Sequence, residues 1–232
     1  MIIGRMPWAA SVYDRTLVVA LPALYRVLSW APLNGGFSLA RSILNHQVRT
    51  DEYPAEEPAA FLLALGQRYQ INTPIVGLMT GVMMARLVRR IVRRDELLLE
   101  CFATVGLSNA LAVGDPATYE EKPGTINLIV VLNQSLTEPA LVEATTIVTE
   151  AKTQALFAAR VKSTMSDALA TGTGTDCVAV ACPQRASMSR YCGKHTVLGE
   201  LLGQVVSEAM VEGLHGAGVG KEQQAERAKH KE

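Results

Sequence analysis

The chain has 232 residues, of which 49% are hydrophobic and 19% are charged. This usage is ordinary for a globular protein and argues against a disordered chain. Twenty-two Lys and Arg residues balance 22 Asp and Glu residues, so the sequence lacks the basic excess typical of proteins that bind nucleic acids. We therefore expect no nucleic-acid partner.

The cysteines and the apolar stretches of the sequence indicate where in the cell we expect the protein. The four cysteines are too few for a disulfide scaffold at this length, so we expect reduced thiols and a cytoplasmic protein. The first ten residues lack the apolar core of a signal peptide. The most apolar stretch, residues 17–32, contains Pro22 and Arg26, and it is shorter than the roughly 18 uninterrupted apolar residues of a spanning helix. We expect no membrane span.

Two apolar runs near the N-terminus lie on either side of Pro22. Residues 17–21 and 25–30 are rich in aliphatic and aromatic side chains and predict two strands. A hairpin is the simplest way to join them, and the Pro, Asn and Gly of residues 32–36 predict a turn after the second strand.

The next segments alternate between helical and strand patterns. Apolar residues at helical spacing predict a helix over 58–69, followed by a buried strand at 75–79. Between 83 and 94 the apolar residues mark one face and five arginines occupy the rest, which predicts a helix with a solvated basic face.

Two aliphatic segments, 97–105 and 125–132, have the pattern of buried strands and should form the centre of the sheet. The longest predicted helix covers residues 137–160. It opens with either a capping box at residues 135–138 or a Thr137 cap.

The last third contains a Gly- and Thr-rich loop at 170–176, a short strand at 177–181 and a helix at 196–214. Apolar residues recur along this helix at i, i+3 and i+4, which indicates one buried face.

The predicted fold is α/β, a single domain with a central mixed β-sheet flanked by helices. The sequence shows no heptads, no internal repeat and no linker that would split it. We expect a lead at 1–16, one domain at 17–214 and a polar, flexible tail at 215–232. The long apolar helices are compatible with a homodimer.

The loop at 170–176 is the first candidate for a binding site. Gly172 and Gly174 stand beside threonine hydroxyls, so backbone amides can approach a polar ligand closely. A phosphate-binding P-loop would be followed by a helix, whereas this loop leads into a predicted strand. The alternative is a tight connection in which glycine supplies a positive φ.

A second candidate lies at the start of the last helix, where Lys194 and His195 precede Thr196. The helix dipole disfavours their charged forms there, so His195 would stay neutral and could act as a base. If Asp176 lies nearby, its carboxylate could orient the imidazole. The alternative is an exposed pair that a helix start tolerates.

Further polar residues stand near the ends of predicted strands or on the long helix: Asn45, His46, Thr80, Ser108, Asn109, Asn127, Glu150 and Lys152. Taken singly, each is more often a cap, turn or satisfied buried group than a catalytic residue. Neither His46 nor His195 has a ligand-type partner at i+3 or i+4, so we expect no metal site.

Seven ordered segments together resemble the adenosylcobinamide amidohydrolases, the CbiZ-type enzymes of corrinoid salvage. The segments are APLNGG (31–36) with ILNHQV (43–48), GLSNA (106–110), GTIN (124–127), TEAKT (149–153), ATGTGTDC (170–177) and GKHT (193–196) followed by LGEL (198–201). The resemblance runs from about Leu17 to Leu214.

This resemblance implies hydrolysis of the amide that joins the aminopropanol arm to the corrin ring of adenosylcobinamide. The products would be adenosylcobyric acid and aminopropanol or its phosphate, in corrinoid salvage or cobamide remodelling. It implies a corrinoid partner. The sequence shows no required cofactor, and the substrate itself carries cobalt.

Amide hydrolysis needs a nucleophile, a proton donor for the leaving amine and donors for the oxyanion. On the motif positions we expect His195 to act as acid/base, with Asp176 orienting it or activating water. Lys194 and the backbone amides of 172–175 would stabilise the oxyanion, and Thr173 or Thr175 could be the nucleophile. The substrate would be held by Asn45, His46, Asn109, Asn127, Glu150, Lys152, Gly172, Thr173 and Gly174.

Two other classes of function remain open at this point. One is a corrinoid-binding protein without catalysis. The other, based on the Gly/Thr loop alone, is a phosphate- or nucleotide-binding enzyme. The low aromatic content, 5%, indicates that aliphatic and Met side chains would supply most apolar contact with a corrin ring.

Overall fold

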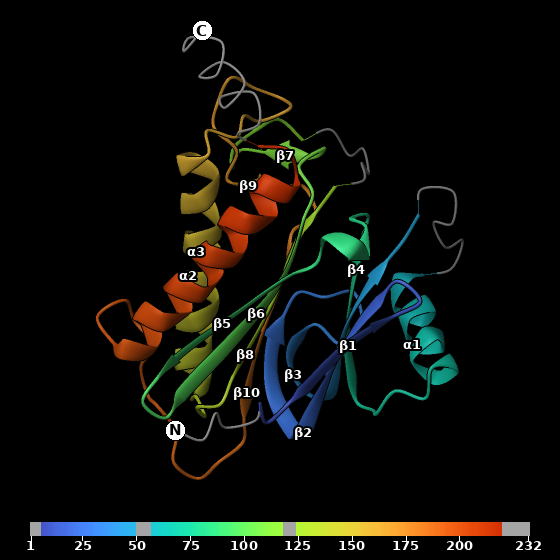
Figure 1. The fold of residues 1–232 in the computed structure, drawn as a ribbon, viewed down its shortest axis with the longest axis vertical. Helices are drawn as coiled ribbons and strands as arrows, with labels where there is room; N and C mark the ends of the chain where they lie inside the picture. Colours follow the sequence, from blue (N-terminus) through green and yellow to red (C-terminus); the bar gives the residue numbers. More distant parts are fainter. Residues whose placement is uncertain (1–5, 50–56, 118–123, 220–232) are drawn as a thin grey trace, which may run out of the picture.

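A computed structural model of the chain describes residues 6–49, 57–117 and 124–219 (Figure 1). An eight-stranded mixed sheet has the order β4-β3-β2-β10-β8-β6-β5, with β1 paired to β2. A small β7-β9 pair lies apart from it. The elements are β1 (Ala9–Tyr13), β2 (Thr16–Ser29), β3 (Gly36–Gln47), α1 (Pro58–Arg68), β4 (Ile75–Thr80), η2 (Met84–Arg86), β5 (Val88–Arg94), β6 (Leu97–Val105), β7 (Ala110–Leu111), β8 (Ile126–Leu132), α2 (Glu138–Ala158), β9 (Gly172–Thr173), β10 (Cys177–Pro183) and α3 (Val197–Gly216).

The sheet folds over on itself, so that two strand layers face each other. In the strand order β3 and β8 are separated by β2 and β10, yet Asn127 of β8 donates to Asn45 Oδ1 of β3 at 2.9 Å. The break lies in β2, where the register with β3 shifts between Ala20 and Tyr25. Folding at this point brings β3 and β4 across β6 and β8.

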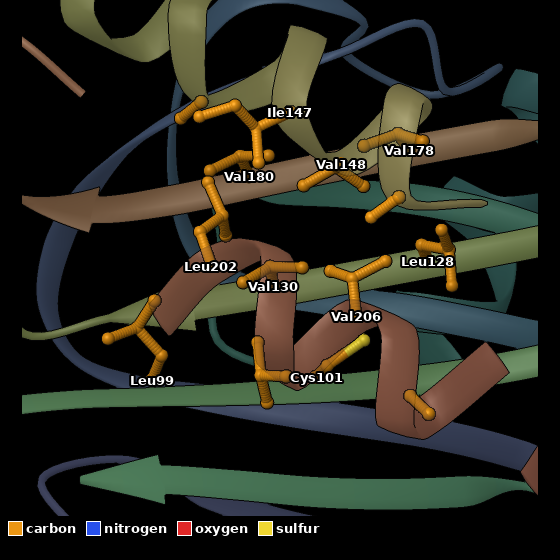
Figure 2. Close-up of a cluster of buried hydrophobic side chains, with 14 of the residues drawn as sticks. Leu99, Cys101, Leu128, Val130, Ile147, Val148, Val178, Val180, Leu202 and Val206 are labelled. Atoms are coloured by element: carbon orange, nitrogen blue, oxygen red, sulfur yellow. The ribbon is translucent and has the colours of Figure 1, made fainter. Parts of the chain in front are cut away.

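Three apolar clusters fill the spaces between the resulting layers. The largest lies between the sheet and the helices α2 and α3, and Figure 2 shows Val130, Val148 and Val206 meeting there. The second lies between the two strand layers and includes Ile43 and Phe102. The third lies under α1. The order of layers is therefore helix, strand, strand, helix, with α1 on one side and α2 and α3 on the other (Figure 1).

Most predicted elements are confirmed. The helices expected at 58–69, 137–160 and 196–214 correspond to α1, α2 and α3, and the strands expected at 75–79, 97–105, 125–132 and 177–181 correspond to β4, β6, β8 and β10. Thr137 caps α2 by accepting from Ala140 N, so the Thr137 cap is confirmed over the capping box. The predicted mixed α/β fold is also confirmed.

The hairpin predicted around Pro22 is wrong. Residues 16–29 form one strand, β2, which pairs antiparallel with β1, β10 and β3. Strand β3 is not among the predicted elements. Pro22 lies in the register break, where the strand needs no ladder hydrogen bond from it. A proline can therefore bend a long strand without ending it.

The helix predicted at 83–94 is also wrong, because most of that segment is strand β5. Val88 and Val92 are buried on the face towards α3, where Arg90 and Arg94 form ion pairs with the α3 residues Glu212 and Glu200. Apolar residues four apart fit a strand as well as a helix, and tertiary pairing decides.

Regular structure reaches into the segments expected to be the lead and the tail. Strand β1 lies inside the segment expected to be a lead, and the preceding Trp8 is only 3% exposed. Helix α3 extends to Gly216, and the rest of the expected tail from residue 220 lies outside the described residues. In the part of the chain that the structure describes, no helix is long and apolar enough to cross a membrane.

A buried carboxylate lies between the two strand layers. Glu100 of β6 is fully buried, accepts from Trp8 Nε1 at 2.5 Å and pairs with Arg89 of β5, whose side chain is 46% exposed. Arg89→Met should lower the free energy of unfolding by about 2 kcal/mol, because it leaves this carboxylate without its cation. Because Arg89 is half exposed, we expect a smaller loss of unfolding free energy than for a cation removed from a fully buried pair.

Arg94→Met is the matched control on the same strand. Both Arg94 and its partner Glu200 are exposed, so their pairing is screened by water and the free energy of unfolding should stay close to that of the wild type. Urea unfolding of both variants measures the difference. Equal losses would contradict a special role for the buried Glu100.

Candidate functional site

Asp176 lies directly before β10 and collects four donors on its carboxylate. Its Oδ1 accepts from Thr173 N at 3.0 Å, Thr173 Oγ1 at 2.5 Å and Ile126 N at 3.3 Å. Its Oδ2 forms an ion pair with Lys152 of α2. The side chains of Asp176 and Lys152 are 10% and 7% exposed, so the pair is largely shielded from solvent.

Glycine shapes this cluster through the space that it leaves. A Cβ placed on Gly172 would collide with Asp176 Oδ2 and come within 2.6 Å of Lys152 Nζ. A Cβ on Gly174 would come within 2.7 Å of Asn109 Nδ2. Neither glycine has a positive φ. At both positions glycine thus leaves room for neighbouring side chains, and a left-handed turn is not the reason for it.

The loop that carries Thr173 is held by a second loop. Ala110 of β7 pairs with Thr173 of β9, and Gly174 N donates to Asn109 O at 3.1 Å. Thr171 Oγ1 accepts from Val113 N at 2.9 Å. Two segments of the family resemblance, 106–110 and 170–177, are thus side by side in the structure.

Beneath this loop a chain of buried polar groups crosses between the strand layers. Asn127 Nδ2 donates to Asn45 Oδ1 at 2.9 Å, and Asn45 Nδ2 donates to Thr104 Oγ1 at 3.1 Å. Thr125 Oγ1 connects the chain upward, since it lies 2.7 Å from Thr175 O and 3.4 Å from Asn127 Oδ1. Asn45 and Asn127 are 2% and 1% exposed. The structure therefore places these two residues as support below the loop.

His46 lies on the opposite face of β3 from Asn45, because side chains alternate along a strand. Its Nδ1 lies 2.8 Å from Thr16 Oγ1, and its ring faces Phe61 of α1. It lines a cavity of about 200 Å³ under α1, together with Tyr69. The structure does not bring His46 to the Asp176 cluster.

The expected pairing of Asp176 with His195 is not formed. His195 is exposed at the start of α3, whose first turn is tied to the end of β5 by the Arg94–Glu200 pair. Arg94 lies opposite Leu97, the first residue of β6, whereas Asp176 lies beside Ile126, which pairs with the last residue of β6. Nine strand residues, about 26 Å, separate these two ends.

Lys194 and Glu150 pair with each other at the surface. Their N–O distance is 2.6 Å, and their side chains are 72% and 48% exposed. Glu150 and Lys152 are two residues apart on α2, so they point in different directions, and only Lys152 reaches Asp176. Lys152 is predicted from the sequence as a substrate-binding residue, but spacing along the chain gives no sign of its partner 24 residues away.

Two of the backbone amides expected to bind an oxyanion already donate hydrogen bonds within the protein. Thr173 N donates to Asp176 and Gly174 N donates to Asn109 O, so these two groups are already satisfied within the protein. At residues 173 and 174 these bonds would have to break before the amides could bind an oxyanion. Lys152 is the cation that the structure places beside the loop instead.

Cys177 follows Asp176 but does not offer a nucleophile. Burial raises the pKa of the Cys177 thiol to about 12, and burial likewise raises the pKa of Cys192 to about 12. Both thiols therefore stay protonated at neutral pH. Within residues 6–49, 57–117 and 124–219 no three His, Cys, Asp or Glu side chains gather as metal ligands.

Comparison with known proteins gives a family and several relatives. The family model described as CbiZ, adenosylcobinamide amidohydrolase, matches residues 4–219. The adenosylcobinamide amidohydrolase of Methanosarcina mazei is 32% identical over 192 residues, covering 78% of this chain and 86% of that protein. The protein of the same name from Halobacterium salinarum is 29% identical over 211 residues, covering 86% and 84% of the two chains.

The uncharacterized protein MJ1613 of Methanocaldococcus jannaschii is 34% identical over 157 residues, 59% of this chain. The match spans about 61% of the length of MJ1613. Because the family model covers nearly the whole described chain, from residue 4 to residue 219, the chain belongs to the adenosylcobinamide amidohydrolase family.

Proposed function

We propose that this protein hydrolyses the amide bond of adenosylcobinamide, giving adenosylcobyric acid and aminopropanol or its phosphate. The observation that carries the proposal is the cluster of Thr173, Asp176 and Lys152, which brings a hydroxyl and a carboxylate of one loop together with a cation of α2 in a member of this family. Its place in metabolism would be corrinoid salvage or cobamide remodelling.

In the proposed mechanism Thr173 Oγ1 attacks the amide carbonyl carbon. Its proton passes to Asp176 Oδ1, to which it is already hydrogen-bonded at 2.5 Å, and a nucleophilic hydroxyl needs such an adjacent base. Asp176 then gives the proton to the nitrogen of the leaving aminopropanol as the C–N bond breaks. Water hydrolyses the resulting ester, which returns the hydrogen to Thr173 and releases the corrinoid acid.

Lys152 stabilises the negative charge of the tetrahedral intermediate in this scheme. Its ammonium has three N–H donors, of which Asp176 accepts one. A cation is worth more in a shielded site than in water, and the Lys152 side chain is only 7% exposed. We propose no cofactor, because hydrolysis involves no net oxidation or reduction. Side chains supply the nucleophile, the group that transfers the proton and the cation for the oxyanion.

Incubation with adenosylcobinamide, followed by chromatography, tests the function. Formation of adenosylcobyric acid together with free aminopropanol is the expected result. Binding seen as a shift of the corrin absorption spectrum, with no released aminopropanol, would overturn hydrolysis in favour of a corrinoid-binding protein. Thermal stabilisation by ATP, and not by cobinamide, would instead indicate a nucleotide-binding protein.

Asp176→Asn and Lys152→Met should each lower kcat by roughly 100- to 10,000-fold, because each removes a group that handles a proton or the developing charge. His195→Ala should keep turnover close to that of the wild type, since His195 lies away from the cluster. Steady-state kinetics with adenosylcobinamide measures all three. Loss of turnover only in His195→Ala would favour the assignment made from sequence and sink this one.

Thr173 and Thr175 are distinguished by their hydroxyl partners. Thr173→Val should lower turnover on the order of 10,000-fold, as expected for loss of a nucleophile, while Thr173→Ser should keep measurable turnover. Thr175 Oγ1 lies 3.5 Å from Gly124 O and away from Asp176, so Thr175→Val should stay within about tenfold of wild type. Mass spectrometry of the protein during turnover should find the acyl adduct on Thr173. Full activity of Thr173→Val would mean that water attacks directly.

Gly172→Ala should reduce turnover on the order of 100-fold, because its Cβ would push Asp176 and Lys152 apart. Gly203→Ala in α3 is the matched control, since its Cβ would meet only Ile147 at 3.9 Å. That variant should keep activity and gain up to about 1 kcal/mol in stability, because alanine favours a helix interior. Kinetics and thermal unfolding of both variants check this, and an active Gly172→Ala enzyme would count against the ion pair in catalysis.

A further inference from the structure

Trp30 is an exposed aromatic side chain joined directly to the candidate catalytic loop. It follows the last residue of β2, its side chain is 49% exposed, and its Nε1 donates to the backbone oxygen of Asp176 at 2.5 Å. Trp8, the other tryptophan of the sequence, is 3% exposed. Trp30 is thus a solvent-facing indole fixed at one edge to the residue that carries the carboxylate.

Trp30 and the catalytic side chains lie on the same face of the sheet. Leu28 packs against the cluster under α2 and α3, and strand alternation puts residue 30 on the same side as residue 28. Ile126 belongs to that cluster too, and its N–H donates to the Asp176 side chain. Lys152 reaches Asp176 from α2, on this same side.

The chain after Trp30 holds the indole in place. Ala31 N donates to Ser29 Oγ at 3.0 Å, and the backbone of Leu33 exchanges hydrogen bonds with Gly77. Asn34 Nδ2 donates to the carbonyl of Ile75 at 2.6 Å. These bonds fix the backbone just after Trp30, and the bond from its Nε1 to Asp176 O fixes the indole itself, which is 49% exposed.

A second exposed apolar side chain lies against the same loop. Val113 is 87% exposed, and its N–H donates to Thr171 Oγ1. Trp30 is hydrogen-bonded at Asp176 and Val113 at Thr171, so the two lie at the ends of a six-residue segment, 171–176, that contains Thr173. Scattered exposed apolar residues are common on protein surfaces, but these two are each hydrogen-bonded to the loop that carries the proposed nucleophile.

We propose that Trp30 is a specificity-determining residue whose indole packs on the apolar face of the corrinoid while Thr173 reaches the amide at the ring's rim. This inference rests on the proposed function. A broad apolar ligand gains more from one fixed aromatic surface than from flexible side chains, because an indole loses little conformational freedom on binding. The N–H bond to Asp176 gives the ring a fixed position relative to the catalytic carboxylate.

Two substitutions separate contact with the substrate from support of the loop. Trp30→Ala removes the aromatic face and should raise KM for adenosylcobinamide about tenfold with kcat nearly unchanged. Trp30→Phe keeps an aromatic face but lacks the N–H donor, and its KM should stay within about threefold of wild type. Tyr191→Ala, at a side chain 62% exposed beside the Cys192–Glu143 contact, is the control and should leave KM unchanged.

Collisional quenching by acrylamide gives an independent readout in the wild-type protein. Acrylamide reaches the exposed Trp30 and not the buried Trp8, so bound cobinamide should shrink the quenchable fraction of the fluorescence. The same fraction should be absent in Trp30→Phe. Circular dichroism confirms that each variant is folded before its kinetics is measured.

The outcomes separate this inference from the proposed function. If the wild type hydrolyses adenosylcobinamide and Trp30→Ala has an unchanged KM, the inference is overturned and the function stands. If Trp30→Phe and Trp30→Ala lose kcat equally with KM unchanged, Trp30 acts only by supporting Asp176, which also overturns it. If the wild type neither binds nor hydrolyses the corrinoid, the function fails and the inference fails with it.

Discussion

The ion pair between Lys152 and Asp176 is the contact on which the arrangement of the site depends. It is nearly shielded from water, and it joins α2, the loop before β10 and, through Ile126 N, the start of β8. A shielded pair gains stability only when its geometry is good and its remaining lone pairs are satisfied. Here Thr173 and Ile126 supply those further donors, so removal of either charge would leave the other buried and unpaired.

Because the sheet folds over on itself, a layer of buried polar groups lies directly beneath the candidate site. Because β2 breaks its register between Ala20 and Tyr25, β3 crosses β8, and Asn45 meets Asn127. Amides that bond to each other in the interior form a stiff network, since every lost bond would leave a buried group unsatisfied. The loop that carries Thr173 therefore rests, through Thr125, on groups that cannot move independently.

Local patterns predicted most elements but not their contacts. Helices α2 and α3 could be predicted from the spacing of their apolar residues, because burial of one face leaves a helical period. Strands β6, β8 and β10 could be predicted from their aliphatic runs, because they are buried on both faces. The prediction for β5 failed because Leu87 and Ile91, four residues apart, suit the period of a helix and that of a strand. The prediction of a hairpin at Pro22 failed because a proline can lie within one long strand, at a break in its register. Both errors come from tertiary pairing, which single segments do not encode.

The candidate site shows the same limit. The Gly/Thr loop and Asp176 were identified from composition, and Lys152 was named as a binding residue. The sequence could not show that Lys152, 24 residues before Asp176, reaches it from a helix, or that His195 starts a helix at the far end of β6. The sequence predicts Trp30 only as the last residue of a strand. An exposed side chain at the end of a strand does not change the apolar pattern, so its exposure could not be predicted.

The adjacent residues Asn45 and His46 serve two different compartments, one between the strand layers and one under α1. Deletion of a single residue between Gly36 and Asn45 would move His46 into the place of Asn45 and Gln47 into the place of His46, because it turns every later side chain of β3 to the opposite face. An imidazole would then enter the amide network, and an amide would replace it against Phe61. We therefore expect such a deletion inside β3 to disturb the buried amide network and the cavity under α1 together.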